Sequence, residues 1–324
     1  MANSTTASRS LWIPKRFRKV LHTFPWSLGV AIGMLIFFLP HPDWHGDLLN
    51  FRTGIEELRH PYWARWIFAA MNLPSEPVAF VILSLICIGL LYFAVRLYGG
   101  KHWVVFTSFA FAWTLIYGQI DAIVVGGLAL AWWAIQKKNA YLVGAGLILA
   151  SIKPQMGLFL GLALWWWSPS RWKALVIPAM VFVLSLIQWG WWVPTWMDAL
   201  LETDFLTSLT RNISLWTIFS WWIWLAWPLV FALPVDRPRK LLAIAATTAM
   251  TVPYFPLPSA VLFLVMPIPT AIYAALQIPL ISNIFGLDIY FLMKLIPPAL
   301  LIWAAWPFLA EKIQILRLAD RKTQ

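Results

Sequence analysis

The sequence predicts an all-α protein, a polytopic bundle of transmembrane helices, on three observations. Of the 324 residues 61% are hydrophobic and only 11% are charged, whereas a soluble globular domain has about 25% charged residues. The mean hydropathy is +0.74. Apolar runs of membrane-spanning length also recur along the whole chain, which is the pattern of a polytopic membrane protein.

The candidate spans follow one another with short polar connections. A crossing needs about 17–25 apolar residues, so the runs near 140–167 are short, and we expect about 10–12 spans. The runs cover residues 24–40, 76–98, 102–117, 119–136, 140–152, 154–167, 172–193, 214–233, 239–255, 258–282 and 290–309.

The charges divide between the two sides of the predicted bundle. With a cytoplasmic N-terminus, the inner segments up to Lys240 carry many lysines and arginines and one acid, Asp236, while the opposite side is acidic. An excess of lysine and arginine is typical of cytoplasmic loops, so we expect a protein of the plasma membrane. The same loops account for the net charge of +11, so we expect no nucleic-acid partner. Eleven spans would leave the basic tail outside, so the span count and the side of the C-terminus stay open.

We expect three parts. Residues 1–23 form a basic cytoplasmic head, residues 24–255 a transmembrane module with an outer loop at 41–75, and residues 256–324 a C-terminal transmembrane segment with a basic tail. The head and the first apolar run are followed by HPDW rather than by a small-residue cleavage site, which indicates an uncleaved helix.

The outer loop predicts a short amphipathic helix. Leu48, Phe51, Ile55 and Leu58 recur at helical spacing, so they form one apolar stripe. Such a helix would lie on the outer membrane surface, with Asp47 in its first turn.

Asp47 and Asp43 are the candidate catalytic residues of this loop, and each has a structural alternative. Asp47 could cap the helix, which is worth ~1 kcal/mol, and Asp43 could form an Asx-turn after Pro42. His41, His45 and His60 do not match a metal-ligand spacing, so we expect no metal site and no cofactor. Oxygen ligands from Asp43 and Asp47 leave a divalent ion open.

Three further polar islands interrupt apolar runs on the predicted outer side. They are Gln119 with Asp121, Lys153 with Gln155, and Arg211 with Asn212. The carboxylate of Asp121 could simply be stabilised by the dipole at a helix N-terminus. Lys153 could extend its ammonium group to the surface at a helix break. An ionisable group at membrane depth otherwise indicates a functional cavity.

Carboxylates and isolated cations on one side suit a reaction in which a hydroxyl loses a proton and a phosphate leaves. Asp47 would be the general base. Lys153 and Arg211, with Arg52 of the outer loop, would stabilise the departing phosphate.

The same segments resemble a family. DLLNFRTGIEELRHPYW resembles the first outer loop of GT-C glycosyltransferases. GQIDAI followed by GAGLILASIKPQ is similar to paired elements of the polyprenyl-phosphate-mannose-dependent mannosyltransferase branch, and RNISL and YFPLPS resemble later elements of that branch. The resemblance runs from about residue 43 to residue 259 and depends on the order of the elements.

The resemblance implies a GT-C-like fold and an inverting transfer of a hexose, mannose by default, from a polyprenyl-phosphate sugar to a lipid or glycan acceptor on the outer face. Asp47 matches the position of the catalytic acid, with Asp43 as the fallback. The sugar- and acceptor-binding candidates are Gln119, Asp121, Gln155 and Asn212. Two departures are Asp121, where the family commonly has Asn, and a short chain, which implies a reduced acceptor-binding part.

Two other classes of function stay open. One is a membrane transporter or lipid flippase, although such proteins commonly show internal repeats and charges near mid-membrane. We find no repeat, and the candidate residues gather at one predicted surface. The other is a non-catalytic or degenerate GT-C-like membrane protein.

Overall fold

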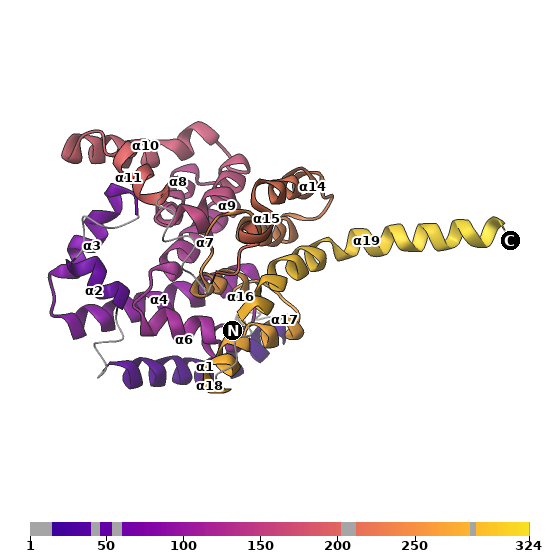
Figure 1. The fold of residues 1–324 in the computed structure, drawn as a ribbon, viewed down its shortest axis with the longest axis horizontal. Coiled ribbons are helices and arrows are strands. Elements are labelled where there is room, and N and C mark those ends of the chain that lie inside the picture. The colour runs from indigo at the N-terminus through magenta and orange to yellow at the C-terminus, as the bar shows by residue number, and fades with distance from the viewer. Residues whose placement is uncertain (1–14, 40–45, 54–59, 202–211, 286–289, 324) are drawn as a thin grey trace, which may run out of the picture.

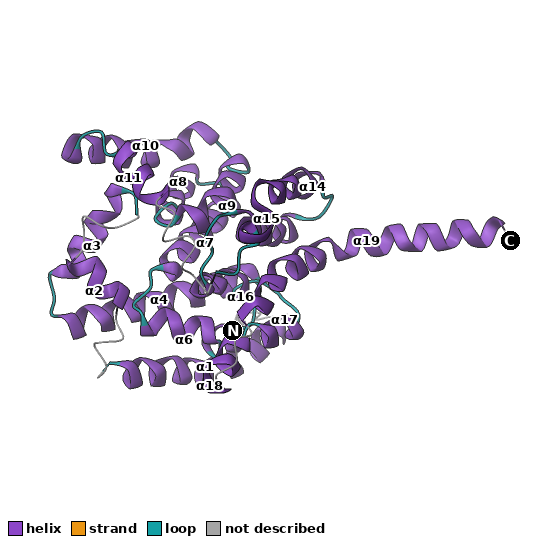
Figure 2. Cartoon of the chain, in the orientation of Figure 1, coloured by secondary structure: helices purple, strands orange, loops and turns teal. Residues whose placement is uncertain are grey.

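The computed structural model describes residues 15–39, 46–53, 60–201, 212–285 and 290–323. Within these ranges the chain is helical apart from turns and one isolated bridge, Asn212 with Pro256, and Figure 2 shows helices and loops only. The predicted all-α class is confirmed.

Four helices form the first part of the chain. They are α1 (Lys15–Phe38), α2 (Gly46–Thr53), η3 (Tyr62–Ala64) and α3 (Arg65–Asn72).

The central helices follow in chain order. They are α4 (Glu76–Tyr98), α5 (His102–Phe106), α6 (Phe109–Ile116), α7 (Asp121–Gln136), α8 (Ala140–Ala150), α9 (Pro154–Trp166), α10 (Arg171–Trp189) and α11 (Val193–Leu201).

The last part of the chain contains shorter helices and one long one. They are α13 (Trp216–Phe219), η4 (Ser220–Leu225), α14 (Ala226–Ala232), α15 (Arg237–Thr251), η5 (Leu257–Ala260), α16 (Val261–Leu264), α17 (Thr270–Ala275), α18 (Ile278–Phe285), η6 (Tyr290–Leu295) and α19 (Ile296–Thr323).

Three helical stretches of the described chain are long and apolar enough to cross a membrane: Glu76–Tyr98, Arg171–Trp189 and Phe291–Gln314. A fourth is added if α6 and α7, which meet at a bend of 115°, count as one broken span. The fold is therefore compatible with a helical membrane protein. The predicted 10–12 spans stay a prediction, because several apolar helices are shorter than a full crossing: Trp26–Phe38, Ala140–Ala150, Trp216–Ala232 and Thr270–Ser282.

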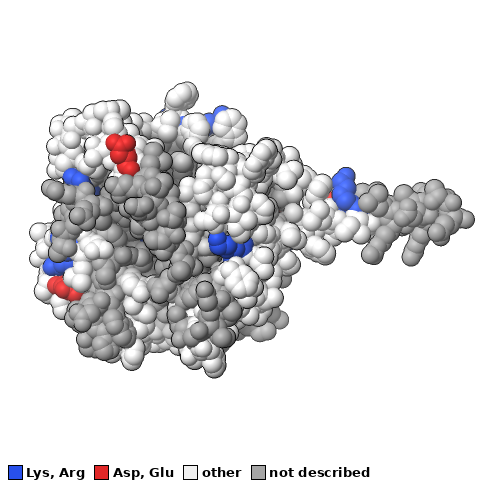
Figure 3. All heavy atoms as spheres, viewed as in Figure 1, with Lys and Arg blue, Asp and Glu red and all other residues white. Residues whose placement is uncertain are grey.

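Charged residues lie toward both ends of the bundle (Figure 3). At one end, Arg171 lies 3.6 Å above the Trp166 ring and Arg237 lies 5.5 Å from the Trp167 ring centroid. We call this the basic end. At the other end, the left in Figure 1, lie α2, α3 and α11. Between them, uncharged atoms predominate in the space-filling view of Figure 3, as expected for a surface that meets lipid.

Helix α19 runs toward the basic end. Lys294, just before it, donates to the hydroxyl of Thr217. Ser214, three residues before Thr217, donates to the carbonyl of Val252, which follows the end of α15 remote from Arg237. Further along α19, Trp303 donates to the carbonyl of Pro267 at 3.3 Å, next to the segment that packs on Gly100. The rest of α19 extends beyond this end in Figure 1. The described part of α19 therefore leaves the bundle at the basic end (Figure 1).

Small residues allow the central helices to pack closely. A Cβ atom added to Gly127 of α7 would lie 2.7 Å from the Gly146 carbonyl oxygen of α8, and one on Gly146 would lie 2.5 Å from the Gly127 oxygen. Close backbone approach at small residues is the usual way in which membrane helices associate.

Gly157 of α9 gives a direct test of this packing. Its added Cβ would lie 2.0 Å from the Ala150 carbonyl oxygen. We expect Gly157→Leu to lower the free energy of unfolding by about 1–3 kcal/mol, the usual cost of overpacking, measured by thermal unfolding in detergent. Gly89→Leu on α4, where nothing lies within 4 Å, is the control. Equal melting temperatures for the two variants would contradict the packing described here.

Candidate functional site

The turn between α6 and α7 lies next to the candidate site. Gly118 has φ +63°, a conformation that favours glycine, and an added Cβ would lie 2.6 Å from Leu48 Cβ. The amide of Leu48 donates to the Tyr117 carbonyl at 3.2 Å. The glycine therefore permits both the sharp turn and the docking of α2 onto it.

A buried ion pair lies directly beyond this turn. Asp121 is the first residue of α7 and is fully buried, and Lys153 immediately precedes α9 and is 6% exposed. Lys153 Nζ lies 2.7 Å from Asp121 Oδ2 and 2.6 Å from Gln119 Oε1. Ser259 Oγ donates to the other carboxylate oxygen at 2.5 Å. Two of the predicted polar islands are thus brought into direct contact.

The surroundings explain why both charges are tolerated. The N-terminus of α7 favours the Asp121 carboxylate, whereas the N-terminus of α9 disfavours a cation at Lys153. The Asp121 carboxylate and the side-chain oxygen of Gln119 compensate for this cost. Removing either charge alone would leave the other buried without a partner, which is strongly destabilising.

The ion pair lies inside the bundle, and the placement of Lys153 on the outer side of a membrane stays a prediction. Cys87 Sγ donates to the Gln119 carbonyl at 3.6 Å, and Cys87 stands midway along α4, a helix of 23 residues. At 1.5 Å per residue, the site is about 16 Å from either end of α4. The reason is that α8 and α9, with 11 and 13 residues, are too short to cross, so the turn between them ends inside the bundle.

The apolar stripe of the first loop also differs from its prediction. Leu48 is fully buried, Phe51 is 3% exposed, and Phe51 stacks on Phe68 of α3 with ring centroids 4.6 Å apart. The stripe therefore packs on the protein rather than on the membrane surface. Ile55 and Leu58 lie outside the described residues.

The remaining candidates of the first loop are only partly placed. Asp47 is the second residue of α2, next to the Leu48 amide that binds the Tyr117 turn. Arg52 Nη1 donates to the carbonyls of Met71 at 2.8 Å and Pro74 at 3.0 Å, so it binds the end of α3. Asp43 lies outside the described residues.

Asn212 has a backbone-binding role in the structure. Its amide nitrogen donates to the Pro253 carbonyl at 2.8 Å, and its oxygen accepts from the amides of Ser214 and Phe255 at 3.0 and 2.9 Å. These bonds hold the segment that leads to Ser259. Sugar binding by Asn212 stays a prediction, and Arg211 lies outside the described residues.

Gln155 is half-buried in the first turn of α9, two residues after Lys153. Its backbone position is close to the ion pair along the chain. Contact with a sugar or an acceptor stays a prediction for this residue.

Two residues of the site were not predicted as site residues. Ser259 appeared only in the resemblance of YFPLPS, and His60 only as a rejected metal ligand. His60 Nδ1 lies 2.8 Å from the Ile152 carbonyl oxygen, and its ring packs at 5.5 Å from that of Phe68. The sequence signals were a single serine after a proline-rich turn at Ser259, and a histidine next to Pro61 at His60.

His60 should make stability depend on pH. Burial, and secondly the charge of Lys153, lower the pKa of His60 from 6.5 to about 4. The unfolded chain therefore binds more protons between these values, and stability falls as the pH is lowered from about 6.5 toward about 4. We expect His60→Gln to reduce this pH dependence, measured as melting temperature in detergent over that range. Equal slopes for the two proteins would contradict this assignment.

Comparison with family models, with curated proteins and with solved structures finds no match for this chain.

A metal centre is not evident in the part of the chain that the structure describes. No group of three or more His, Cys, Asp or Glu side chains there is arranged to hold an ion. His41, Asp43 and His45 lie outside the described residues. The chemically active groups that are placed are an ammonium, a carboxylate, an amide and a hydroxyl.

Proposed function

We propose that the chain is an integral membrane glycosyltransferase of GT-C type that transfers a hexose, mannose by default, from a polyprenyl-phosphate sugar to a lipid or glycan acceptor. The observation that carries the proposal is the buried group of Lys153, Asp121, Gln119 and Ser259 beneath α2. Ionisable groups buried inside a membrane bundle are costly and commonly mark functional sites.

Lys153 is the proposed phosphate-binding cation. An ammonium has three donors, and two of them serve Asp121 and Gln119, so one remains for a phosphate oxygen. Gln119 is only half-buried, so the group is reached from the side of the turn. Arg52 and Arg211 would contribute further positive charge.

The proposed reaction is a direct displacement. The Asp47 carboxylate takes the proton of the acceptor hydroxyl, and the acceptor oxygen forms a bond to the anomeric carbon. The bond from that carbon to the phosphate oxygen breaks, and its electron pair leaves with the polyprenyl phosphate. The configuration inverts, and no second carboxylate is needed to activate water, in contrast to an inverting hydrolase.

The placement of Asp47 supports this role. Helix α2 begins at Gly46, and the Leu48 amide binds the turn that carries Gln119. The backbone of Asp47 is thus one residue from the contact that joins the first loop to the site. The charges favour an orientation in which the basic end lies in the cytoplasm and α2 lies toward the outer face of the plasma membrane.

A transporter is the second candidate, and a specific observation favours it. The ion pair lies halfway along α4, beside a helix pair that bends by 115°. Broken helices and ionisable groups at mid-depth are typical of transporter binding sites.

Reconstituted protein separates these two candidates. Proteoliposomes loaded with labelled polyprenyl-phosphate mannose and a mixed lipid and glycan acceptor pool should yield a new mannoside if the chain is a transferase. Movement of the labelled donor across the bilayer without a new glycosidic bond would instead support transport and overturn the transferase proposal.

A further inference from the structure

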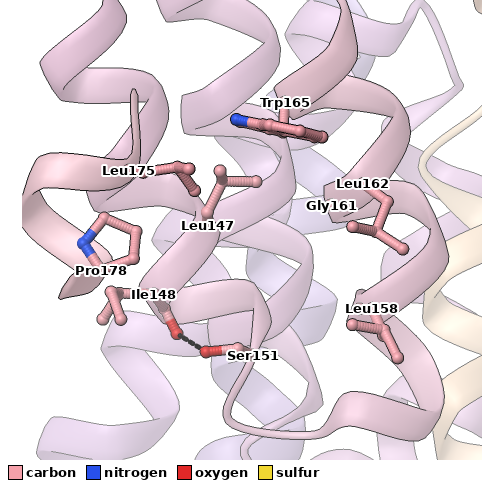
Figure 4. A pocket seen from close by; sticks show the side chains of 10 residues that line it. Leu147, Ile148, Ser151, Leu158, Gly161, Leu162, Trp165, Leu175 and Pro178 are labelled. Carbon is pink, nitrogen blue, oxygen red and sulfur yellow. Dashed lines mark hydrogen bonds between the residues drawn. The ribbon is translucent and has the colours of Figure 1, made fainter. Parts of the chain in front are cut away.

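An apolar groove of about 310 Å³ lies between α8, α9 and α10, apart from the ion pair (Figure 4). Leu158 and Leu162, on the α9 wall, are 47% and 49% exposed, so the groove opens on the outside of the bundle. The hydroxyl of Ser151, which lines the groove, donates to the Ile148 carbonyl at 2.9 Å. The groove therefore presents hydrocarbon to whatever occupies it.

A missing side chain contributes to the groove. Gly161 leaves part of the α9 wall bare, because an added Cβ there would meet only Leu147 Cδ2, at 3.4 Å. Pro178 forms part of the opposite wall, on α10. The groove therefore depends on the small residues at these positions of α9 and α10.

The Arg171 guanidinium lies over the ring of Trp166, the neighbour in sequence of the lining residue Trp165. Arg171 begins α10, and Leu175 and Pro178, which line the groove, follow it by four and seven residues, so the three share a helix face. Trp165, another lining residue, donates to the Arg171 carbonyl at 3.0 Å. Among the described residues no carboxylate forms an ion pair with Arg171.

We propose that this groove binds one acyl chain of an anionic phospholipid from the leaflet at the basic end, with the lipid phosphate on Arg171. Helix α10 is long and apolar enough to cross a membrane and is mostly exposed, so lipid chains are its natural neighbours. The volume equals that of about ten water-sized groups, which suits one hydrocarbon chain. Basic residues beside grooves between membrane helices bind anionic headgroups in this way.

This lipid is distinct from the proposed sugar donor. Lys153 is 6% exposed and its ammonium faces Asp121 in the interior, whereas the Arg171 side chain is exposed. The two anion-binding groups therefore serve different molecules, and the lipid site does not depend on the transfer reaction.

Lipid retention tests the proposal. The full chain is purified from membranes, exchanged into nanodiscs of phosphatidylglycerol and phosphatidylcholine, and the lipids that remain bound after release into mild detergent are counted by native mass spectrometry. We expect selective retention of phosphatidylglycerol by the wild type. Gly161→Phe, which fills the groove, should abolish it, and Arg171→Gln should weaken it about fivefold, the effect of one basic contact near a lipid headgroup.

Matched variants control for general effects. Gly89→Phe places the same side chain on an open face of α4, and Lys137→Gln removes an exposed charge after α7. Both should retain the lipid as the wild type does. Equal retention of phosphatidylcholine and phosphatidylglycerol, or wild-type retention in both Gly161→Phe and Arg171→Gln, would overturn the proposal. Arg171→Gln keeps the test decisive if Gly161→Phe does not fold, because Arg171 is exposed.

Discussion

Replacing Lys153 by methionine is expected to lower the free energy of unfolding by about 3–5 kcal/mol, because it leaves a buried charge without its partner. Asp121 is fully buried and has the Lys153 ammonium at 2.7 Å. The substitution also removes the donor that Gln119 Oε1 binds at 2.6 Å. Thermal or denaturant unfolding of the protein in detergent measures the change.

Lys173→Met is the matched control for this variant, because Lys173 is exposed on α10. Its loss should change stability by less than about 0.5 kcal/mol, as is usual for surface substitutions. A Lys153→Met protein as stable as Lys173→Met would show that the two buried groups do not depend on each other in the folded chain.

Asp47→Asn is expected to lower the rate of sugar transfer by about 10²–10⁴-fold, the usual contribution of a general base. The amide cannot accept the hydroxyl proton, while donor binding at Lys153 is unaffected. The turnover number should therefore fall with little change in the KM for the donor, in assays with reconstituted protein.

Asp198→Asn controls for the loss of a carboxylate at the same end of the bundle, because Asp198 is exposed on α11. It should transfer sugar at the wild-type rate. Undiminished transfer by Asp47→Asn would remove Asp47 from the proposed role and leave Asp43 as the candidate base.

The sequence predicted the class of the fold because composition and apolar runs report the helices directly. It also selected Gln119, Asp121 and Lys153, since polar residues within apolar runs are costly and stand out. It did not pair them. Asp121 and Lys153 are 32 residues apart and Ser259 is 138 residues from Asp121, and only the packing of α7, α8, α9 and η5 brings them together.

Two differences between the sequence-based interpretation and the structure share a physical cause. Helical periodicity shows that Leu48 and Phe51 lie on one face, but not whether that face meets lipid or protein, and in the structure it meets Phe68 and the Gly118 turn. Likewise, hydropathy counts each polar turn as a surface turn. The turn at Lys153 lies at the level of Cys87, halfway along α4, because the helices on either side of it are short.

The double variant Asp121→Asn with Lys153→Met tests the central claim most directly. It removes both charges together, so its stability should return close to that of the wild type, since neutral replacement of a buried ion pair is often harmless. Binding of labelled polyprenyl-phosphate mannose to this variant in nanodiscs is the decisive measurement. We predict a folded protein that no longer binds the donor, and wild-type donor binding by the same protein would show that the pair only stabilises the fold.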